Sequence, residues 1–301
     1  VNVARAVKRQ TNKKFVLCKK LCPILVNCVS VCLDSILNGD VFNVVFLFKI
    51  KELAVEIKTR KGRLSALKGE GSRATCIVEC FFDKIFEGVD WFHFTGITPA
   101  LGPNVVEICR EACIAAKAKG VKISCDLNYR GKLWTREEAN KAMTELCKYV
   151  DVCISNEEDA KDVFGIEAEG TDIDSGKLNH AGYISVARQI CQRFGCEKVA
   201  ITLRSSISAN DNDWAAMLYT DGQAYFSPTY RIHIVDRVGG GDSFGGGLIY
   251  GLLSGKDSQS AINFAVAASC LKHTIEYDFN LVSVQEVESL AAGNATGRVQ
   301  R

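Results

Sequence analysis

The sequence is poor in the residues that form metal sites. Its 301 residues include only four histidines, and none of the fourteen cysteines belongs to a Cys-x-x-Cys pair. The closest pairs ahead of residue 83 have four-residue spacing, at Cys18/Cys22, Cys28/Cys32 and Cys76/Cys80. Structural zinc takes four nitrogen or sulfur ligands, usually from closer pairs of this kind together with histidines. We therefore expect no zinc site.

A strong net charge is lacking as well, because 37 Lys and Arg residues are balanced by 35 Asp and Glu residues. A net charge of +2 favours no particular partner. A domain that binds nucleic acid is expected to carry a clear basic excess. We therefore predict no nucleic-acid partner.

Long apolar runs are also missing. Residues 21–33 follow Lys19 and Lys20 in the manner of a signal peptide, but eighteen residues precede this pair and Asp34 follows the run. The run 41–50 is too short to span a bilayer. We expect each run to form a buried strand or helix, and we predict no membrane partner. Cysteines scattered among apolar residues are typical of reduced, buried thiols, which favours a cytoplasmic protein.

From residue 83 onward, apolar strands alternate with helices. Strands are predicted at 89–95, 121–125, 150–155 and 198–203, and helices at 103–119, 135–149, 182–195, 243–253, 258–272 and 284–291. Thr135 and Glu138 form a capping box at the start of one helix. A hairpin is predicted around the pair Asp221-Gly222. The alternation predicts an α/β fold, with a mostly parallel sheet covered by helices on both faces.

The stretch from Val235 to Gly247 has the composition of an anion-binding corner. Gly239, Gly240 and Gly241 separate an Ile- and Val-rich run from an apolar segment long enough to begin a helix. Glycines at such a corner let backbone N–H groups converge, and the first helical turn adds its own. Asp242 follows them, where a carboxylate suits proton abstraction from an attacking hydroxyl. The alternative is a mobile glycine loop with Asp242 as a helix cap.

Polar residues follow several predicted strands, where the functional loops of a parallel sheet gather. They are Asp126, Asn128 and Arg130, then Asn156, Glu157 and Asp159, then Thr202 and Arg204, and last the glycine corner. Each group alone is typical of a solvated turn. On one edge they would supply an acid, an anion cradle, basic groups and carboxylates able to orient hydrated Mg²⁺.

The glycine corner resembles the C-terminal signature D-T-x-G-A-G-D of the ribokinase-like (PfkB) carbohydrate kinases. Asp236 to Asp242 match this pattern, with Arg237 in place of Thr and Gly240 in place of Ala. Further segments are similar to the 2-dehydro-3-deoxygluconate kinases of that family, namely 92–97, 126–134, 155–160, 202–205, 272–275, 278–280 and 297–301. The resemblance covers about residues 83–301. It implies a ribokinase-like three-layer sandwich that phosphorylates the primary hydroxyl of 2-dehydro-3-deoxy-D-gluconate to the 6-phosphate.

The resemblance also implies roles for individual residues. Asp242 would accept the proton of the sugar hydroxyl, and the three glycines would stabilise charge on the transferred phosphoryl group. Arg130 and Asp278 would bind the sugar-acid substrate, and Tyr277 stands where the family usually has Gly before this Asp. The other assignments are Asn156, Thr202, Arg204, Ser205 and Asn263 at ATP, and Glu157 and Asp159 acting through water on Mg²⁺. A monovalent cation such as K⁺ is a further candidate cofactor.

The first part of the chain departs from the family pattern. Family members begin with a strand and a sugar-binding Gly-Gly element, ahead of a helix that opens near a segment like Asn2-Val3-Ala4. On this comparison the sequence would start at that helix, and Glu79-Cys80-Phe81 stands where a substrate contact is expected. We therefore predict two parts. Residues 1–82 are a divergent remnant of the first βα units and of an incomplete β lid, which an altered reading frame would explain, and residues 83–301 are the kinase domain.

Two alternatives stay open on the sequence. One is a catalytically impaired, nucleotide-binding remnant that keeps only the C-terminal half-site, because the Gly-Gly element and lid are incomplete. The other is a different sugar kinase of the family, such as a fructokinase or a ribokinase. A homo-oligomer is expected if the lid is intact, because in the family the lid also forms a dimer interface.

Overall fold

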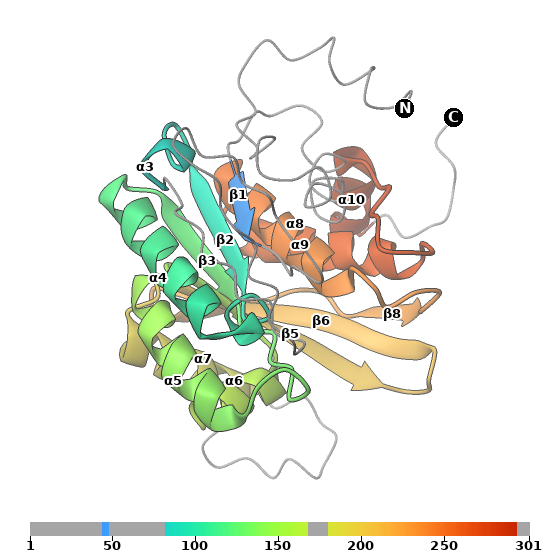
Figure 1. Ribbon diagram of the computed structural model, residues 1–301. Coiled ribbons are helices and arrows are strands. Elements are labelled where there is room, and N and C mark those ends of the chain that lie inside the picture. Colours follow the sequence, from blue (N-terminus) through green and yellow to red (C-terminus); the bar gives the residue numbers. More distant parts are fainter. Residues whose placement is uncertain (1–43, 48–81, 168–179, 294–301) are drawn as a thin grey trace.

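The computed structural model describes residues 44–47, 82–167 and 180–293. These residues form a three-layer α/β sandwich, in which one eight-stranded sheet lies between two groups of helices (Figure 1). The predicted α/β sandwich with a mostly parallel sheet is confirmed. The lid, the early cysteine pairs, the segment 79–81 and the C-terminal segment 297–301 lie outside the described residues. The homo-oligomer therefore stays a prediction.

Five strands run parallel and lie side by side in chain order. They are β1 (Val44–Leu47), β2 (Trp91–Thr95), β3 (Lys122–Asp126), β4 (Val152–Ser155) and β5 (Lys198–Ser206). β1 lies within the run 41–50, so that run contains a strand. Thr95 pairs with Asp126, and Ser155 pairs with Ile201. The carboxyl ends of these strands therefore share one edge of the sheet, where the polar loops begin.

Three antiparallel strands extend the sheet: β6 (Asp211–Thr220), β7 (Gln223–Phe226) and β8 (Tyr230–His233). β6 and β7 join at Asp221 and Gly222, which have φ values of 52° and 76°. Two positive φ angles are what a two-residue hairpin turn requires, so the predicted hairpin is confirmed. β5 runs to Ser206, past the predicted end at Leu203, because pairing with β6 continues to that residue.

One face of the sheet is covered by α4 (Pro103–Ala118), α5 (Arg136–Leu146), α6 (Glu157–Phe164) and α7 (His180–Phe194), with the short α3 (Phe82–Ile85) beside α4 (Figure 1). Side chains such as Ile123, Met143 and Ile190 form the larger core beneath these helices. Thr135 accepts the N–H of Glu138 at 3.2 Å, and the Glu138 carboxylate accepts the N–H of Thr135 at 2.9 Å. The predicted capping box is confirmed.

The opposite face is covered by α8 (Gly240–Leu253) and α9 (Ser258–His273), and α10 (Val284–Ala291) packs against α9. Ile154, Ala200 and Leu248 belong to the core on this side. The helices α8 and α9 approach closely, since a Cβ added to Gly251 would lie 3.1 Å from the Cα of Ala261. This contact sets the position of α8, and with it the glycine corner at the helix N-terminus.

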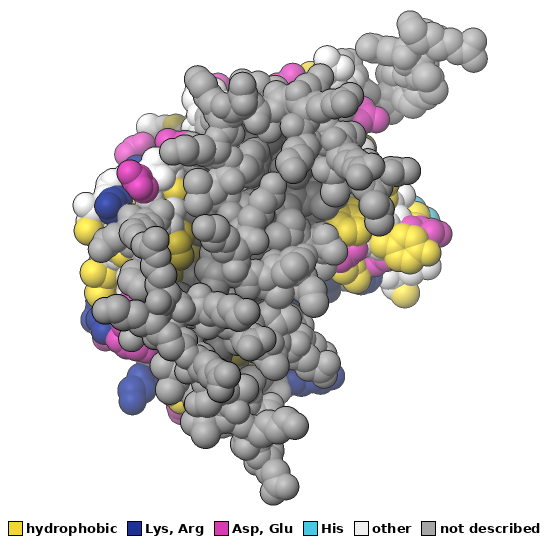
Figure 2. Space-filling model, turned by 45° about the horizontal axis from the view of Figure 1, so that its top comes forward, with side chains coloured by type: hydrophobic (Ala, Val, Ile, Leu, Met, Phe, Trp, Pro, Cys, Tyr) yellow, Lys and Arg dark blue, Asp and Glu magenta, His cyan; other side chains and the backbone are white. Residues whose placement is uncertain are grey.

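Three observations on the described residues concern the surroundings of the chain. The eight cysteines among them are free, and seven of these are buried. None of the described helices combines the length and the apolar character that crossing a membrane requires. Along the edges of Figure 2, where described residues are visible, Lys and Arg side chains lie among Asp and Glu side chains. This mixed surface fits the small net charge of the chain.

Candidate active site

Acidic residues from three separate elements meet at the carboxyl edge of the sheet. Asp126 ends β3, Asp159 lies in the first turn of α6, and Asp242 lies in the first turn of α8. The pKa of Asp126 is raised well above its usual range, first by burial and then by the charges of Asp159 and Asp242. Arg130 acts on the same carboxyl in the opposite direction. The structure thus brings together predicted groups that lie far apart in the sequence.

The glycine corner begins α8 with a left-handed residue. Gly239 is the N-cap, at φ 78° and ψ 0°. A Cβ there would lie 2.6 Å from the carbonyl oxygen of Asp278, whereas a Cβ on Gly240 would overlap the ring of His273. Around Gly241 there is open space. Packing therefore requires Gly239 and Gly240 to be glycines, and Gly241 presents accessible backbone next to the first-turn N–H groups.

Asp236 joins this corner to the loop that follows α9. Its carboxylate accepts the N–H groups of Val238 and Tyr277, each at 2.9 Å. These bonds favour the ionised form and hold the pKa of Asp236 below its usual range. Tyr277 has φ 65°, in the left-handed region that favours glycine. The chain therefore keeps a left-handed turn where the family usually has Gly, with a tyrosine in it.

Asp242 combines accessibility with desolvated surroundings. Its side chain is exposed, yet enough protein surrounds the carboxyl that desolvation raises its pKa. Arg130 lowers this pKa, and Asp278 raises it. A carboxyl that is open to a ligand and has a raised pKa is suited to accept a proton from a hydroxyl.

Asp159 is buried at the start of α6. The side-chain oxygen of Asn156 accepts the N–H of Asp159 at 2.6 Å, so Asn156 is the N-cap of this helix. Oδ1 of Asp159 accepts the N–H of Tyr129 at 3.1 Å. Burial raises the pKa of Asp159 to about 6, against the lowering effects of Tyr129 and Arg130. The side chain of Glu157 lies outside the described residues.

The carboxyl groups of Asp126, Asp159 and Asp242 fit a hydrated divalent cation, because a nearby positive charge would favour their ionised forms. Mg²⁺ keeps several of its waters and usually meets protein through one or two carboxylates. Within the part of the chain that the structure describes, no three His, Cys, Asp or Glu side chains are arranged as direct ligands of a metal. Contact through water, as expected for Asp159, stays a prediction.

The residues predicted at the nucleotide are divided between the two faces of the sheet. Thr202, Arg204 and Ser205 lie within β5, so the expectation that a loop begins at this point is wrong. Thr202 and Arg204 share a face with Ala200, which packs beneath α8 and α9. Ser205 shares the other face with Leu203, which packs in the larger core.

Asn263 lies on α9, which covers the same face as Thr202. Its side-chain oxygen accepts a hydrogen bond from Nε2 of Gln259 at 2.8 Å. The same nitrogen donates a second hydrogen bond to the carbonyl of Phe226 at 2.8 Å. Asn156 caps α6, which covers the opposite face. The predicted nucleotide-binding residues therefore lie on both faces of the sheet. A nucleotide that contacted all of them would have to extend from one face to the other around the end of β5.

The sequence assigns no role to two buried polar residues behind the glycine corner. Lys272 is fully buried at the end of α9, and its ammonium donates to the carbonyls of Ile275 at 3.0 Å and Tyr277 at 2.5 Å. Asn280 is also fully buried and donates to the hydroxyl of Ser243 at 3.2 Å. A lysine at the end of a largely apolar helix is the signal that marks Lys272.

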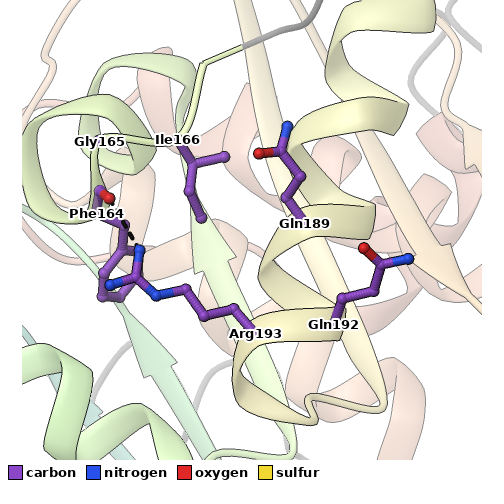
Figure 3. A pocket seen from close by; sticks show the side chains of 6 residues that line it. All are labelled: Phe164, Gly165, Ile166, Gln189, Gln192 and Arg193. Atoms are coloured by element: carbon purple, nitrogen blue, oxygen red, sulfur yellow. Dashed lines mark hydrogen bonds between the residues drawn. The ribbon is translucent and has the colours of Figure 1, made fainter.

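A shallow hollow lies at the far end of α6 from Asp159 (Figure 3). Its lining residues are Phe164, Gly165, Ile166, Gln189, Gln192 and Arg193. Arg193 donates to the carbonyl of Phe164 at 3.0 Å, and its guanidinium lies 5.5 Å from the centre of that ring. The charged group of the hollow is therefore already engaged, and the carboxylates of the glycine corner do not line it.

Comparison with known proteins identifies the family. The model of the pfkB family carbohydrate kinases matches residues 53–276. The chain belongs to this family. A solved 2-dehydro-3-deoxygluconokinase from Thermotoga maritima is 52% identical, with a TM-score of 0.66 over 70% of this chain and 62% of that chain. The predicted resemblance to PfkB carbohydrate kinases is confirmed.

Two further similarities concern a curated relative and a solved structure. A curated 2-dehydro-3-deoxygalactonokinase from Haloferax volcanii is 28% identical over 213 residues, which are 71% of this chain and 60% of the relative. A putative ribokinase II from Escherichia coli, solved with ATP and Mg²⁺, is 20% identical with a TM-score of 0.55 over 70% of this chain and 61% of that chain. The last similarity concerns the fold alone. This PfkB chain spans about 60% of the length of the curated relative.

Proposed function

We propose that this PfkB protein transfers the γ-phosphoryl group of ATP to the primary hydroxyl of 2-dehydro-3-deoxy-D-gluconate, giving the 6-phosphate. One observation carries the proposal. Asp242 is an accessible carboxyl in the first turn of α8, close behind a left-handed glycine N-cap. A proton acceptor and the N–H groups of a helix N-terminus are thus adjacent, as phosphoryl transfer to a hydroxyl requires.

The proposed reaction uses the residues around this corner in distinct ways. Asp242 accepts the proton of the substrate hydroxyl while the hydroxyl oxygen forms a bond to the γ-phosphorus. The bond from phosphorus to the bridging oxygen breaks, and its electron pair leaves with ADP. The N–H groups of the three glycines stabilise charge on the transferred group. Arg130 binds the carboxylate or phosphate of the ligand, and Asp278 binds a sugar hydroxyl.

ATP and Mg²⁺ are the proposed cofactors. Bound Mg²⁺ neutralises charge on the phosphate oxygens. Asp159 and Glu157 are the proposed contacts to its waters. Thr202, Arg204 and Asn263 form the part of the predicted nucleotide set that lies toward α8 and α9, with Asn156 and Ser205 on the other face. A dependence on K⁺ stays a prediction.

The proposed substrate is a six-carbon 2-dehydro-3-deoxy sugar acid. Support comes from the names of the relatives, which specify the gluconate and the galactonate. Arg130 lies beside Asp242, so a carboxylate-bearing substrate has a cation available. An assay that couples ADP release to substrate addition tests this with 2-dehydro-3-deoxygluconate, its galactonate epimer, fructose and ribose. We expect the highest kcat/KM for the gluconate.

The same assay, combined with calorimetry of Mg·ATP binding, separates the alternatives. Higher kcat/KM for fructose or ribose would identify another sugar kinase of the family. Heat from Mg·ATP binding without turnover of any sugar would support the nucleotide-binding remnant. Absence of both turnover and Mg·ATP binding would contradict each of these functions.

A further inference from the structure

Lys272 is a buried cation for which the proposed phosphoryl transfer has no direct use. It lies in the last turn of α9 with none of its surface exposed. Its ammonium donates to the carbonyl oxygens of Ile275 and Tyr277, at 3.0 Å and 2.5 Å. A buried charge costs stability unless it is well paired. The two carbonyls that it binds belong to the loop leading to Asp278.

The surroundings of Lys272 connect this loop to the glycine corner. Its Cε would lie 3.2 Å from a Cβ on Gly239, so the aliphatic stem packs against the N-cap of α8. Its charge also lowers the pKa of Asp236, to a smaller extent than the hydrogen bonds from Val238 and Tyr277 do. Asp236 in turn accepts the N–H of Tyr277 at 2.9 Å. An anion thus holds the N–H of Tyr277, and a cation holds its carbonyl.

This double attachment fixes the residue that precedes Asp278. Tyr277 has a left-handed backbone, φ 65°, which is unfavourable for a side chain with a Cβ. Carbonyl oxygens brought together around one point repel one another, and a cation between them removes that repulsion. The carbonyl of Asp278 packs against Gly239, and the Asp278 carboxylate acts on Asp242. Displacing this loop would therefore disturb both the N-cap and the proposed base.

We propose that Lys272 is a positioning residue, whose ammonium acts as a built-in cation that locks the Asp278 loop against the glycine corner. The proposal rests on the proposed kinase function and deepens it. Removing the ammonium leaves backbone carbonyls that face a cavity, and such carbonyls bind small monovalent cations. A folded variant with a shortened side chain should therefore accept NH₄⁺ or K⁺ at this point, whereas the wild type should not.

The test uses Lys272→Ala, which opens the cavity, and Lys272→Gln, which keeps a neutral donor and protects against failure to fold. Lys256→Ala is the matched control, because Lys256 pairs with Glu288 at 2.9 Å on the surface at the other end of α9. Melting temperature, kcat and KM for ATP are measured in choline chloride, then in ammonium and potassium chloride at equal ionic strength. Choline is too large for the cavity.

We expect both Lys272 variants to lose about 10²-fold in kcat in choline, because small misplacements of reacting groups have costs of this order. KM for ATP should change much less. Ammonium or potassium should raise the melting temperature of Lys272→Ala and restore part of its kcat, by more than any change that the same salts cause in the wild type and in Lys256→Ala. Normal kcat in both Lys272 variants would overturn the proposal, and so would equal behaviour of Lys272→Ala in all three salts, including failure to fold. The melting temperatures in the three salts test the cation role of Lys272 even if the wild type turns over no sugar.

Discussion

At the scale of single residues, the proton acceptor of Asp242 is the simplest feature to remove. Asp242→Asn keeps the shape of the side chain and removes its basicity. A positioned general base typically supplies about 10²–10⁴-fold in rate, so kcat should fall by that range while the Kd for Mg·ATP changes little. Asp221→Asn is the control, because it makes the same chemical change in the β6–β7 turn, where Asn tolerates positive φ. Near-normal kcat in Asp242→Asn would assign the proton to another group.

Asp159 predicts a pH dependence of stability with a definite sign. Its pKa is raised to about 6 in the folded chain, against about 3.9 in an unfolded chain. The folded state therefore binds the proton more tightly. The resulting stabilisation is complete below about pH 4 and is lost as pH rises through about 6.

Asp159→Asn should escape this loss. The free energy of unfolding of the variant, relative to the wild type, should rise by up to about 3 kcal/mol between pH 4 and pH 7 in urea titrations. Asp257 should contribute to stability with the opposite pH dependence. Its carboxylate caps α9 by accepting the N–H of Ser260 and has a lowered pKa, so its contribution is lost as pH falls. A pH-independent difference between Asp159→Asn and the wild type would show that this carboxyl titrates normally.

Tyr277 predicts a stabilising substitution. Its left-handed backbone costs a residue with a Cβ about 1–2 kcal/mol, and its side chain is 73% exposed, so little packing would be lost. Tyr277→Gly removes the strain, and the greater freedom of glycine in the unfolded chain offsets part of the gain. We expect urea unfolding to show a net gain of up to about 1 kcal/mol. The free energy of unfolding of Tyr277→Asn should lie between those of the wild type and Tyr277→Gly. A clear loss of stability in Tyr277→Gly would mean that the tyrosine ring packs against another part of the chain.

At the scale of elements, the contact between α8 and α9 depends on glycine. A Cβ on Gly251 would lie 3.1 Å from the Cα of Ala261, whereas a Cβ on Gly245, in the same helix, would lie 3.6 Å from Cδ1 of Ile154. Gly251→Ala should therefore lose stability, because overpacking costs about 1–3 kcal/mol and exceeds the gain in helix propensity of about 1 kcal/mol.

Gly245→Ala is the matched variant. Its new methyl makes an ordinary contact, so the propensity gain should dominate and raise the free energy of unfolding by up to about 1 kcal/mol. Opposite signs in urea titrations would support the close approach of α8 to α9. Equal effects of the two substitutions would mean that the helices can separate, and that this contact does not position the glycine corner.

At the scale of the whole molecule, the two faces of the sheet decide which predicted residues can meet one nucleotide. Thr202, Arg204 and Asn263 lie toward α8 and α9, the side of the glycine corner, whereas Ser205 lies toward the other core. Arg204→Met should weaken Mg·ATP binding about tenfold in calorimetry, as loss of a charge-assisted hydrogen bond would. Ser205→Ala should leave the Kd nearly unchanged. The reverse order would place the nucleotide on the other face.

Local patterns determined much of this protein. The capping box at Thr135, the hairpin at Asp221-Gly222 and the alternation of strands and helices each depend on residues close together in the chain, so the α/β fold class follows from the sequence. The glycine corner and Asp242 are visible in the same way, because three glycines followed by an acid form a local pattern, although the packing against Asp278 and His273 comes from the fold. The family resemblance added the proposed ligands.

The tertiary structure alone decided how these parts act on one another. β5 continues through Arg204 because β6 pairs with it. The residues of β5 themselves do not show where this pairing stops, so the end of the strand could not be predicted from them. Asp159 and Asp242 raise the pKa of Asp126 because the end of β3 and the first turns of α6 and α8 lie together, since electrostatic coupling depends on distance in space. Lys272 is an ordinary lysine in the sequence. It becomes a buried cation only because the loop after α9 folds back and brings the carbonyl of Tyr277 to the end of that helix, where Lys272 lies.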